Sequence, residues 1–295
     1  MRVLVAGASG FIGSELTKQL EADGHTVLTL GRRAPAHENE YLWLPSTLTV
    51  DPRAIEGTDA VINLAGASTG RIPWTTNYKR EILYSRVLGT QTIAEAMGRA
   101  LNPPKILLNG SAVGYYGDRP GEVLTETSSK GDGFLSDVVE AWEKSAQLTP
   151  EGTRVVTFRT GLVVGEGGAF TPLIPLTRFG LGASFGTGDQ SWPWVALYDE
   201  AAAIRHLLTS SLEGVVNISG PTPATSKLIT DALADALGRW HPWVVPEFAL
   251  NLLGDAGRDL LLASQDVVPE RLLADGFEFR YGTAQSAIAE LARTL

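Results

Sequence analysis

The sequence predicts an α/β protein with a doubly wound parallel sheet, and three observations support this fold class. The apolar run Val3–Ala6 is long enough for one buried strand and too short for a helix. A glycine-rich turn follows it, and an amphipathic run begins at Ser14, so the order is strand, turn, helix. Apolar strands then alternate with helix-length segments as far as residue 165, a pattern typical of a parallel sheet with right-handed crossovers.

Gly7, Gly10 and Gly13 lie at three-residue spacing in the turn that ends the first strand. In a dinucleotide-binding turn the first glycine permits a tight reversal, the second lets the backbone approach a pyrophosphate, and the third lets the helix lie close to the strand. The free N–H groups at the helix start then face the anion. Because a strand and a helix flank the motif, we expect a Rossmann-type dinucleotide site rather than a bare structural turn. Its expected contacts are Gly7, Ser9, Gly10, Phe11, Ile12 and Gly13.

The second strand, expected at 25–30, is followed by Gly31, Arg32 and Arg33. An NAD-selective site would carry Asp or Glu at this strand end to bind the ribose 2′-hydroxyl. Two arginines suit a 2′-phosphate, because guanidinium groups form forked, charge-assisted hydrogen bonds with phosphate oxygens. The alternative is a solvated basic loop. We expect NADP (NADPH) as the cofactor, with these three residues at its 2′-phosphate.

Small residues at the next strand ends are expected to line the cofactor crevice. The segment 59–68 is a buried strand that breaks into a turn, in which Leu64, Ala65 and Gly66 lie against the adenosine and ribose. The other expected elements are a short strand at 48–50, a helix at 75–100, a strand and turn at 105–118, a helix at 134–148 and a strand at 154–165.

The composition changes at Gly165, after which Gly and Pro become frequent. We therefore expect an NADP-binding domain at 1–164, to which 195–220 returns, and a smaller C-terminal substrate lobe at 165–295. A strand at 213–220 and helices at 226–237 and 247–262 are expected there. The glycine-rich residues 166–170 form either a flexible flap over the nicotinamide or a plain loop.

The composition also excludes several classes of protein. The 295-residue chain has a formal net charge of -9, which opposes binding to nucleic acid. It has no cysteine for a disulfide, a catalytic thiolate or a metal, and its histidines have no second ligand at metal spacing. No apolar stretch approaches the roughly 18–20 residues of a membrane helix, and no signal segment precedes the first strand. These features predict a cytoplasmic protein with a small-molecule substrate and no nucleic-acid, membrane or metal partner.

The motifs GASGFIG, INLAGA and FRTGLVVG resemble successive markers of the extended short-chain dehydrogenase/reductase superfamily. A closer resemblance is to an atypical branch labelled NAD-dependent epimerase or SulA-type nucleotide-sugar epimerase. It rests on SAVGYYG, FRTGLVVGEGGAF, GLGASFGTGDQSWPWV and QDVVPERLLADGFEF, the last of which resembles the branch's own C-terminal domain. The resemblance spans essentially the whole chain and implies a nicotinamide cofactor with oxidoreductase or epimerase chemistry.

The chain departs from this family pattern at the expected catalytic pair. Typical members carry a Tyr and, four residues later, a Lys in the helix after the serine-bearing turn; the Tyr exchanges a proton, and the Lys lowers its pKa. Val139 and Glu143 stand at these positions, and a Trp-Glu pair in this helix resembles the atypical branch. Ser111 resembles the active-site hydroxyl. With the usual pair absent, Ser111, Glu143, Tyr115 or a bound water must move the proton.

The resemblance also implies cofactor contacts away from the glycine turn. Arg86 stands where extended members usually have Asn, and it would direct a cation toward the crevice. Asp199 keeps its place and is expected to cap the next helix, while Ala196 replaces a common His. The implied cofactor contacts are Leu64, Ala65, Glu81, Arg86 and Val163, and we also expect Gly110 beside the cofactor.

Two classes of function follow. The first is an NADP-binding atypical oxidoreductase or sugar-nucleotide-epimerase-like enzyme that holds a small molecule between its two lobes. The alternative is a non-catalytic NADP(H)-binding sensor or scaffold, which the missing Tyr-Lys pair motivates. Extended relatives often dimerise through helices that correspond to 75–100 and 134–148, so a homodimer is expected by analogy.

Overall fold

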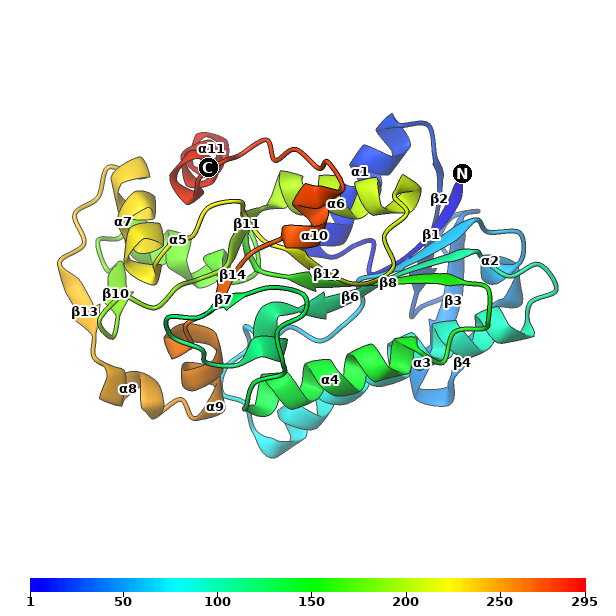
Figure 1. The fold of residues 1–295 in the computed structure, drawn as a ribbon, viewed down its shortest axis with the longest axis horizontal. Helices are drawn as coiled ribbons and strands as arrows, with labels where there is room; N and C mark the ends of the chain where they lie inside the picture. The colour runs from blue at the N-terminus through cyan, green and yellow to red at the C-terminus, as the bar shows by residue number, and fades with distance from the viewer.

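The computed structural model describes residues 1–295 and has an eight-stranded sheet at its centre (Figure 1). The strands lie in the order β4–β3–β2–β1–β5–β6–β8–β12, and all neighbours are parallel except β3 and β4. The predicted class, an α/β fold with a Rossmann-type doubly wound sheet, is confirmed. The strands are β1 (Arg2–Ala6), β2 (Thr26–Gly31), β3 (Glu40–Leu44), β4 (Thr49–Val50), β5 (Ala60–Asn63), β6 (Ile106–Ala112), β8 (Arg154–Thr160) and β12 (Gly214–Ile218).

Helices cover both faces of the sheet, with α1 and α6 packed together on one face and α3 and α4 on the other (Figure 1). The central strand β1 is apolar from Val3 to Ala6 because its alternate side chains enter different cores. Val3 and Val5 pack with α1 and α6, whereas Leu4 and Ala6 pack with α3. None of the helices is long and apolar enough to cross a membrane. The helices are α1 (Phe11–Ala22), α2 (Pro52–Ile55), α3 (Thr76–Arg99), α4 (Phe134–Ala146) and α6 (Leu197–Thr209).

The third parallel strand lies earlier than the sequence predicts. A strand was expected at 48–50, but Glu40–Leu44 forms β3, and Thr49–Val50 forms β4, which returns antiparallel to it. In β3 only Trp43 is buried, and Leu42 and Leu44 are exposed at the sheet edge. Because the apolar residues of β3 do not alternate with polar ones, the segment lacks the pattern that identifies a half-buried strand from sequence.

The strand expected at 154–165 is divided at Gly161. After β8 ends at Thr160, β9 (Leu162–Val164) leaves the main sheet and pairs with β11 (Trp194–Ala196). A Cβ at Gly161 would overlap the carbonyl oxygen of Pro193, so the two backbones cross at a spacing that only glycine allows. The division directs the chain out of the sheet toward the C-terminal elements.

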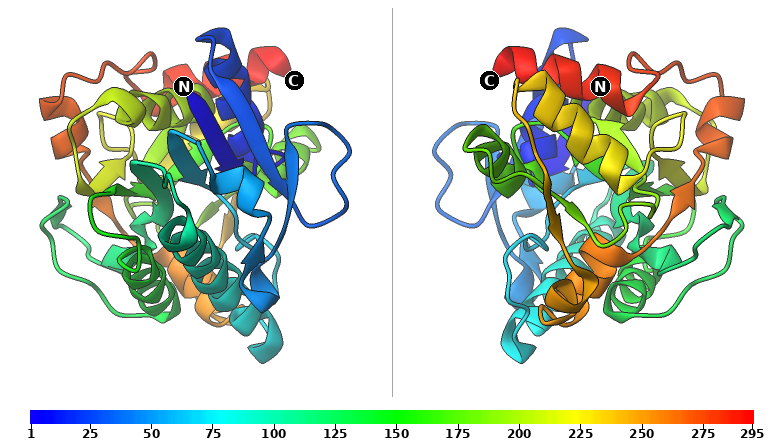
Figure 2. Two further views of the ribbon diagram at one scale, coloured as in Figure 1. Left: turned by 90° about the vertical axis from the view of Figure 1, so that its right-hand side faces the viewer. Right: turned by 90° about the vertical axis from the view of Figure 1, so that its left-hand side faces the viewer.

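The C-terminal elements have a core of their own, built around Phe170, Trp194, Ile229 and Ile288. The helix α11 lies beside α7 in this part of the molecule (Figure 2). The helix expected at 247–262 is broken: its first piece ends at Asn251, and Gly254, which adopts φ +64°, precedes the second piece. The division at residue 164 stays a prediction, although β12 lies within the main sheet. The elements are α5 (Phe170–Arg178), β10 (Ala183–Phe185), α7 (Ser226–Ala236), β13 (Trp243–Val245), α8 (Glu247–Asn251), α9 (Asp255–Gly257), a π-helical turn (Arg258–Leu262), β14 (Asp266–Val267), α10 (Glu270–Ala274) and α11 (Ala284–Thr294).

Glu200 in the first turn of α6 is a fully buried carboxyl group, and this makes the stability of the fold dependent on pH. Burial raises its pKa to about 8, against the opposing effect of the hydrogen bond donated by Thr160 Oγ1 over 2.6 Å. The folded state therefore holds the proton more tightly than the unfolded chain does. The stabilisation is complete below the ordinary pKa of 4.5 and is lost as the pH rises through about 8.

We expect the free energy of unfolding to fall between pH 6 and pH 9 by more in the native chain than in Glu200→Gln, which cannot ionise. Denaturant titrations at both pH values measure this difference. An equal fall in the two proteins would contradict the assignment to Glu200.

Candidate active site

The start of α1, directly after the glycine turn, leaves three backbone donors free. Gly10 N and Ser14 N are bonded to the carbonyl oxygens of Gly7 and Gly10, whereas the N–H groups of Phe11, Ile12 and Gly13 have no acceptor in the protein. No side chain caps the helix at Gly10. The positive end of α1 therefore points free donors at one spot, which suits an anion such as a pyrophosphate.

Two of the glycines are required by the backbone itself. Gly7 has φ +84°, and a Cβ on it would lie 3.0 Å from the backbone of Leu64. A Cβ on Gly13 would overlap the carbonyl oxygen of Gly7. The turn after β1 is thus in contact with the turn after β5, and α1 starts directly on top of them. The glycine turn leaves the backbone accessible to a dinucleotide, so the residues present fit such a cofactor.

The loop at 165–168 rests on the side chain of Phe11. Cβ atoms at Gly165 and Gly167 would lie 2.6 Å and 2.5 Å from the Phe11 ring. Whether residues 166–170 form a flexible flap or a plain loop is not tested. The close packing on Phe11 shows why the segment needs its glycines. The expected contacts next to Phe11 differ in exposure, since Ser9 is exposed and Ile12 is half-buried.

At the end of β2, Arg32 and Arg33 are exposed and form no ion pair with any carboxylate. A carboxylate does lie nearby, because Glu40 of β3 points at Gly31; a Cβ on Gly31 would be 2.5 Å from Glu40 Oε1. The other Glu40 oxygen accepts the Ala36 N–H over 2.7 Å and closes the loop. Sequence reasoning missed Glu40, because the β3 strand that brings it to Gly31 was not predicted.

Arg86 of α3 supports the turn that follows β5. Its Nη1 donates to the carbonyl oxygens of Ala67 and Ile82, both over 3.0 Å, and its guanidinium lies 5.1 Å from the ring centre of Trp142. Burial lowers the pKa of Arg86 to about 10, so it stays a cation at neutral pH. It has no carboxylate partner. The crevice therefore holds a positive charge that the protein itself does not neutralise.

The remaining expected cofactor residues are in varied surroundings. Glu81 is exposed on α3, and Val163 lies in β9 opposite Val195. Gly110 is buried, and a Cβ on it would lie 2.9 Å from the Asn63 oxygen and 3.3 Å from Trp142. Its position permits Trp142 to pack directly on β6. Whether these residues contact a cofactor stays a prediction.

Ser111, Glu143 and Arg159 form one hydrogen-bonded cluster. Ser111 of β6 and Arg159 of β8 are direct neighbours in the sheet, and Glu143 comes from α4. Ser111 Oγ donates to Glu143 Oε1 over 2.7 Å; Arg159 Nε and Nη2 donate to the two Glu143 oxygens, both over 2.8 Å. The Arg159 side chain is 3% exposed. Although burial lowers the pKa of Arg159, the hydrogen bonds to Glu143 outweigh it, and the pKa lies above its ordinary value.

Arg159 is the functional residue that sequence reasoning missed. Its signal was present: an arginine within the apolar strand of residues 154–160 must be buried and therefore needs a counter-ion. The strand alone could not reveal which carboxylate supplies it.

Tyr115 lies next to this cluster with a free hydroxyl. The Arg159 guanidinium is 3.4 Å from the ring centre of Tyr115 and holds that ring by a cation–π contact. The hydroxyl of Tyr115 has no hydrogen-bond partner in the protein, whereas Tyr116 is buried and donates to Asn217 Oδ1 over 2.7 Å. Burial raises the pKa of Tyr116. Val139 is buried in α4, and its aliphatic side chain has no acidic proton to transfer.

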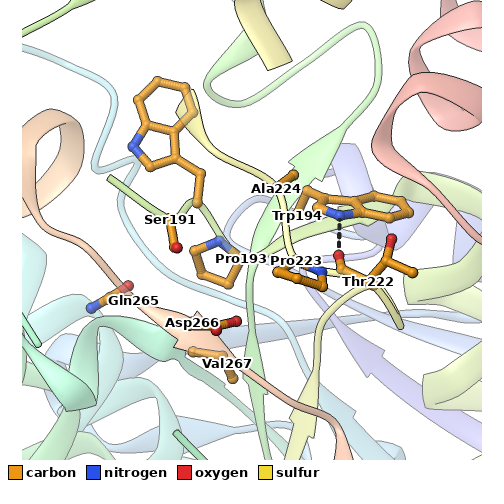
Figure 3. A pocket seen from close by; sticks show the side chains of 11 residues that line it. Ser191, Pro193, Trp194, Thr222, Pro223, Ala224, Gln265, Asp266 and Val267 are labelled. Atoms are coloured by element: carbon orange, nitrogen blue, oxygen red, sulfur yellow. Dashed lines mark hydrogen bonds between the residues drawn. The ribbon is translucent and has the colours of Figure 1, made fainter. Parts of the chain in front are cut away.

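Trp194 of β11 is part of the C-terminal core. It is buried and donates to the Thr222 carbonyl oxygen over 2.8 Å. The cavity beside it, shown in Figure 3, has about 10 Å³, which is room for about one water molecule. Trp194 therefore packs in the core and does not line a substrate-sized cavity.

Asp199 does not cap its helix with its side chain. Its two carboxylate oxygens accept the backbone N–H groups of Arg280 and Tyr281 over 2.9 and 3.0 Å. The expectation of a helix cap is therefore wrong; the residue anchors the segment before α11 because that segment passes over the start of α6.

The free helix N-terminus lies where the strand order reverses, between β1 and its neighbours β2 and β5. In doubly wound sheets this is where dinucleotides bind, so the fold and the site define a dinucleotide-binding α/β protein. The chain belongs to the NAD dependent epimerase/dehydratase family, whose model matches residues 3–219. Residues 245–291 match a second family, a domain of unknown function (DUF1731). The predicted membership in the NAD-dependent epimerase-like branch, with its own C-terminal domain, is confirmed.

Relatives span nearly the whole chain. The epimerase family protein ML0860 of Mycobacterium leprae is 37% identical over 97% of this chain and 94% of its own. The human epimerase family protein SDR39U1 is 35% identical over 99% of both chains.

Solved structures agree with this assignment. The human SDR39U1 structure, determined with NADPH, has a TM-score of 0.92 and 33% identity over 100% of both chains. A nucleoside-diphosphate sugar epimerase from Corynebacterium glutamicum has a TM-score of 0.80 and 30% identity over 99% of this chain and 58% of its own. MoeE5 in complex with UDP-glucose and NAD, at 23% identity and a TM-score of 0.79, shares the fold.

Proposed function

We propose that this chain binds NADPH across the carboxyl ends of β1, β2 and β5 and acts on a small molecule held beside Ser111 and Tyr115. The observation that carries the proposal is the set of free N–H groups at Phe11, Ile12 and Gly13. The human relative determined with NADPH supports the same cofactor here. The family makes an oxidoreductase or epimerase reaction the best-supported chemistry.

The cofactor would be held by its charges at two places. The free N–H groups at the start of α1 receive the pyrophosphate, and Arg32 and Arg33 meet the 2′-phosphate. Arg86 adds a positive charge within the crevice. When bound, NADPH supplies the hydride for the reaction.

The proton at the substrate oxygen is assigned to Tyr115. Ser111 already donates its hydrogen to Glu143, and Glu143 is engaged as an anion by Arg159. The Tyr115 hydroxyl has no such commitment, and Arg159 fixes the orientation of its ring. The Ser111 oxygen is then held in a fixed place as an acceptor, and it orients a substrate group that donates a hydrogen bond.

Replacement of Arg32 and Arg33 by Ala should weaken NADPH binding by about 10- to 100-fold, because charge-assisted hydrogen bonds to the 2′-phosphate are lost. Calorimetric titration with NADPH measures the change. NADH lacks this phosphate, so its affinity is the internal control and should barely move. Equal losses for both cofactors would contradict the placement of the arginines.

The reaction is tested by following NADPH oxidation with a panel of ketones and sugar nucleotides. Tyr115→Phe should lower turnover by about 100-fold or more and leave NADPH affinity unchanged. The exposed Tyr84 of α3 is the matched control, and Tyr84→Phe should turn over normally. Tight NADPH binding without turnover of any compound in the panel would favour the sensor function instead.

A homodimer through α3 and α4, expected by analogy with extended relatives, is also part of this proposal. Analytical ultracentrifugation measures it directly, and a single monomeric species at high protein concentration would exclude it.

A further inference from the structure

A C-terminal segment, residues 255–268, is attached to α3, to α4 and to a short strand that follows the Tyr115 turn. Asp255 pairs with Lys79 of α3, and Asp259 Oδ2 accepts the Leu135 N–H over 3.0 Å in the first turn of α4. Farther along, Val268 N donates to the Leu124 carbonyl oxygen over 2.9 Å, where β14 pairs with β7 (Val123–Leu124). This segment lies within the domain of unknown function.

Gln265 is the point at which the segment contacts the turn that carries Tyr115. That turn is a 3-10 helix, Val113–Tyr116, directly after β6. The Gln265 Nε2 donates to the carbonyl oxygens of Val113 over 3.2 Å and of Gly117 over 2.8 Å. The residue is 7% exposed. One buried amide therefore joins both ends of the turn.

The neighbours of Gln265 strengthen this attachment. Ser264 N donates to Asp118 Oδ1 over 2.8 Å, and Arg119 N donates to the Ser264 carbonyl oxygen over 2.9 Å. Gln265 supplies a donor to a carbonyl oxygen at each end of the turn, and buried carbonyl groups are normally bonded in this way. The path of the chain at Tyr115 thus depends on a side chain about 150 residues away.

We propose that Gln265, through its hydrogen bonds to both ends of the turn, is a positioning residue for Tyr115. The expected effect on catalysis rests on the proposed function. The expected effect on the structure of the turn rests on the hydrogen bonds alone. It assigns to the domain of unknown function a part in aligning the proton-transfer residue.

Gln265→Met tests the proposal because methionine keeps the volume of the side chain and removes both donors. The matched control is Gln190→Met. Gln190 is also an amide of the C-terminal part that bridges two carbonyl oxygens, those of Phe185 and Leu261 over 3.1 and 2.8 Å, and it does not touch the turn. Gln265→Asn, which keeps a donor with a shorter reach, replaces Gln265→Met if that variant does not fold.

Hydrogen exchange measured by mass spectrometry on the full chain without cofactor reports the structural part. Amides 113–117 should exchange about tenfold faster in Gln265→Met, and they should be unchanged in Gln190→Met. Equal exchange in all three proteins would overturn the proposal. This result does not depend on whether the protein binds NADPH or turns over.

The effect of Gln265 on catalysis is measured by steady-state kinetics with NADPH and with phenanthrenequinone as the probe substrate. In Gln265→Met, kcat should fall about 10- to 100-fold because the reacting hydroxyl is displaced, with the NADPH dissociation constant within about twofold of the native value. Gln190→Met should keep its kcat. Faster exchange with an unchanged kcat would overturn the positioning role, and absence of NADPH binding by the native chain would instead refute the proposed function.

Discussion

Replacement of Arg159 by methionine should destabilise the protein by about 3–5 kcal/mol, because the change leaves the Glu143 carboxylate buried without its counter-charge. Methionine fills much of the same space, so the loss reports on charge and hydrogen bonding rather than on a cavity. Denaturant unfolding followed by tryptophan fluorescence measures it. Glu143, which accepts the Ser111 hydrogen bond, loses the guanidinium that holds it in place, so turnover should fall together with stability.

A double-mutant cycle separates the pair from its surroundings. Glu143→Leu combined with Arg159→Met removes both charges and should recover a large part of the lost stability, since no unpaired ion remains. Arg99→Met is the control, because Arg99 pairs with Glu95 at the exposed surface, where ion pairs contribute little. If the double variant were as unstable as the sum of the single variants, the two side chains would not be coupled.

Gly13→Ala should weaken NADPH binding by about 10- to 100-fold and lower the free energy of unfolding by about 1–3 kcal/mol. The added methyl group would overlap the Gly7 carbonyl oxygen, so α1 must shift away from the turn and its free N–H groups leave their common focus. Calorimetric titration with NADPH and thermal unfolding measure the two effects.

The control for this substitution is Gly98→Ala near the end of α3, where a Cβ meets nothing within 4 Å. Alanine favours the helix at that exposed position, so this variant should be more stable by about 1 kcal/mol with unchanged NADPH affinity. Normal NADPH binding by Gly13→Ala would show that the glycine turn does not hold the pyrophosphate.

Features that depend on neighbouring residues could be predicted from the chain itself. The three glycines, the apolar run before them and the helix after them are local requirements of one turn, and the structure has all of them. The α3 and α4 helices likewise follow from periodic apolar residues over a long span. Elements with one buried residue or an internal break, such as β3 and the segment 247–262, carry too little of this signal.

The family resemblance was sufficient to select Ser111, Glu143 and Tyr115 as the candidates for proton transfer, but not to say what each of them does. Glu143 was a candidate base by its chemistry, and its partner Arg159 makes it an anchor for Ser111. Gln265 attracted no attention in the sequence, because an isolated glutamine has no characteristic spacing.

The sequence by itself determined the fold class and the cofactor turn, because both depend on the backbone preferences and burial of short stretches of chain, and its motifs were sufficient to identify the family. Only the tertiary structure decided which charges neutralise one another and which carbonyl groups a distant amide bonds. Those pairings join Ser111 to Arg159 through strand register and Val113 to Gln265 over a separation of 152 residues in the chain. Such contacts form between segments far apart in the chain, so their free energy leaves no local pattern.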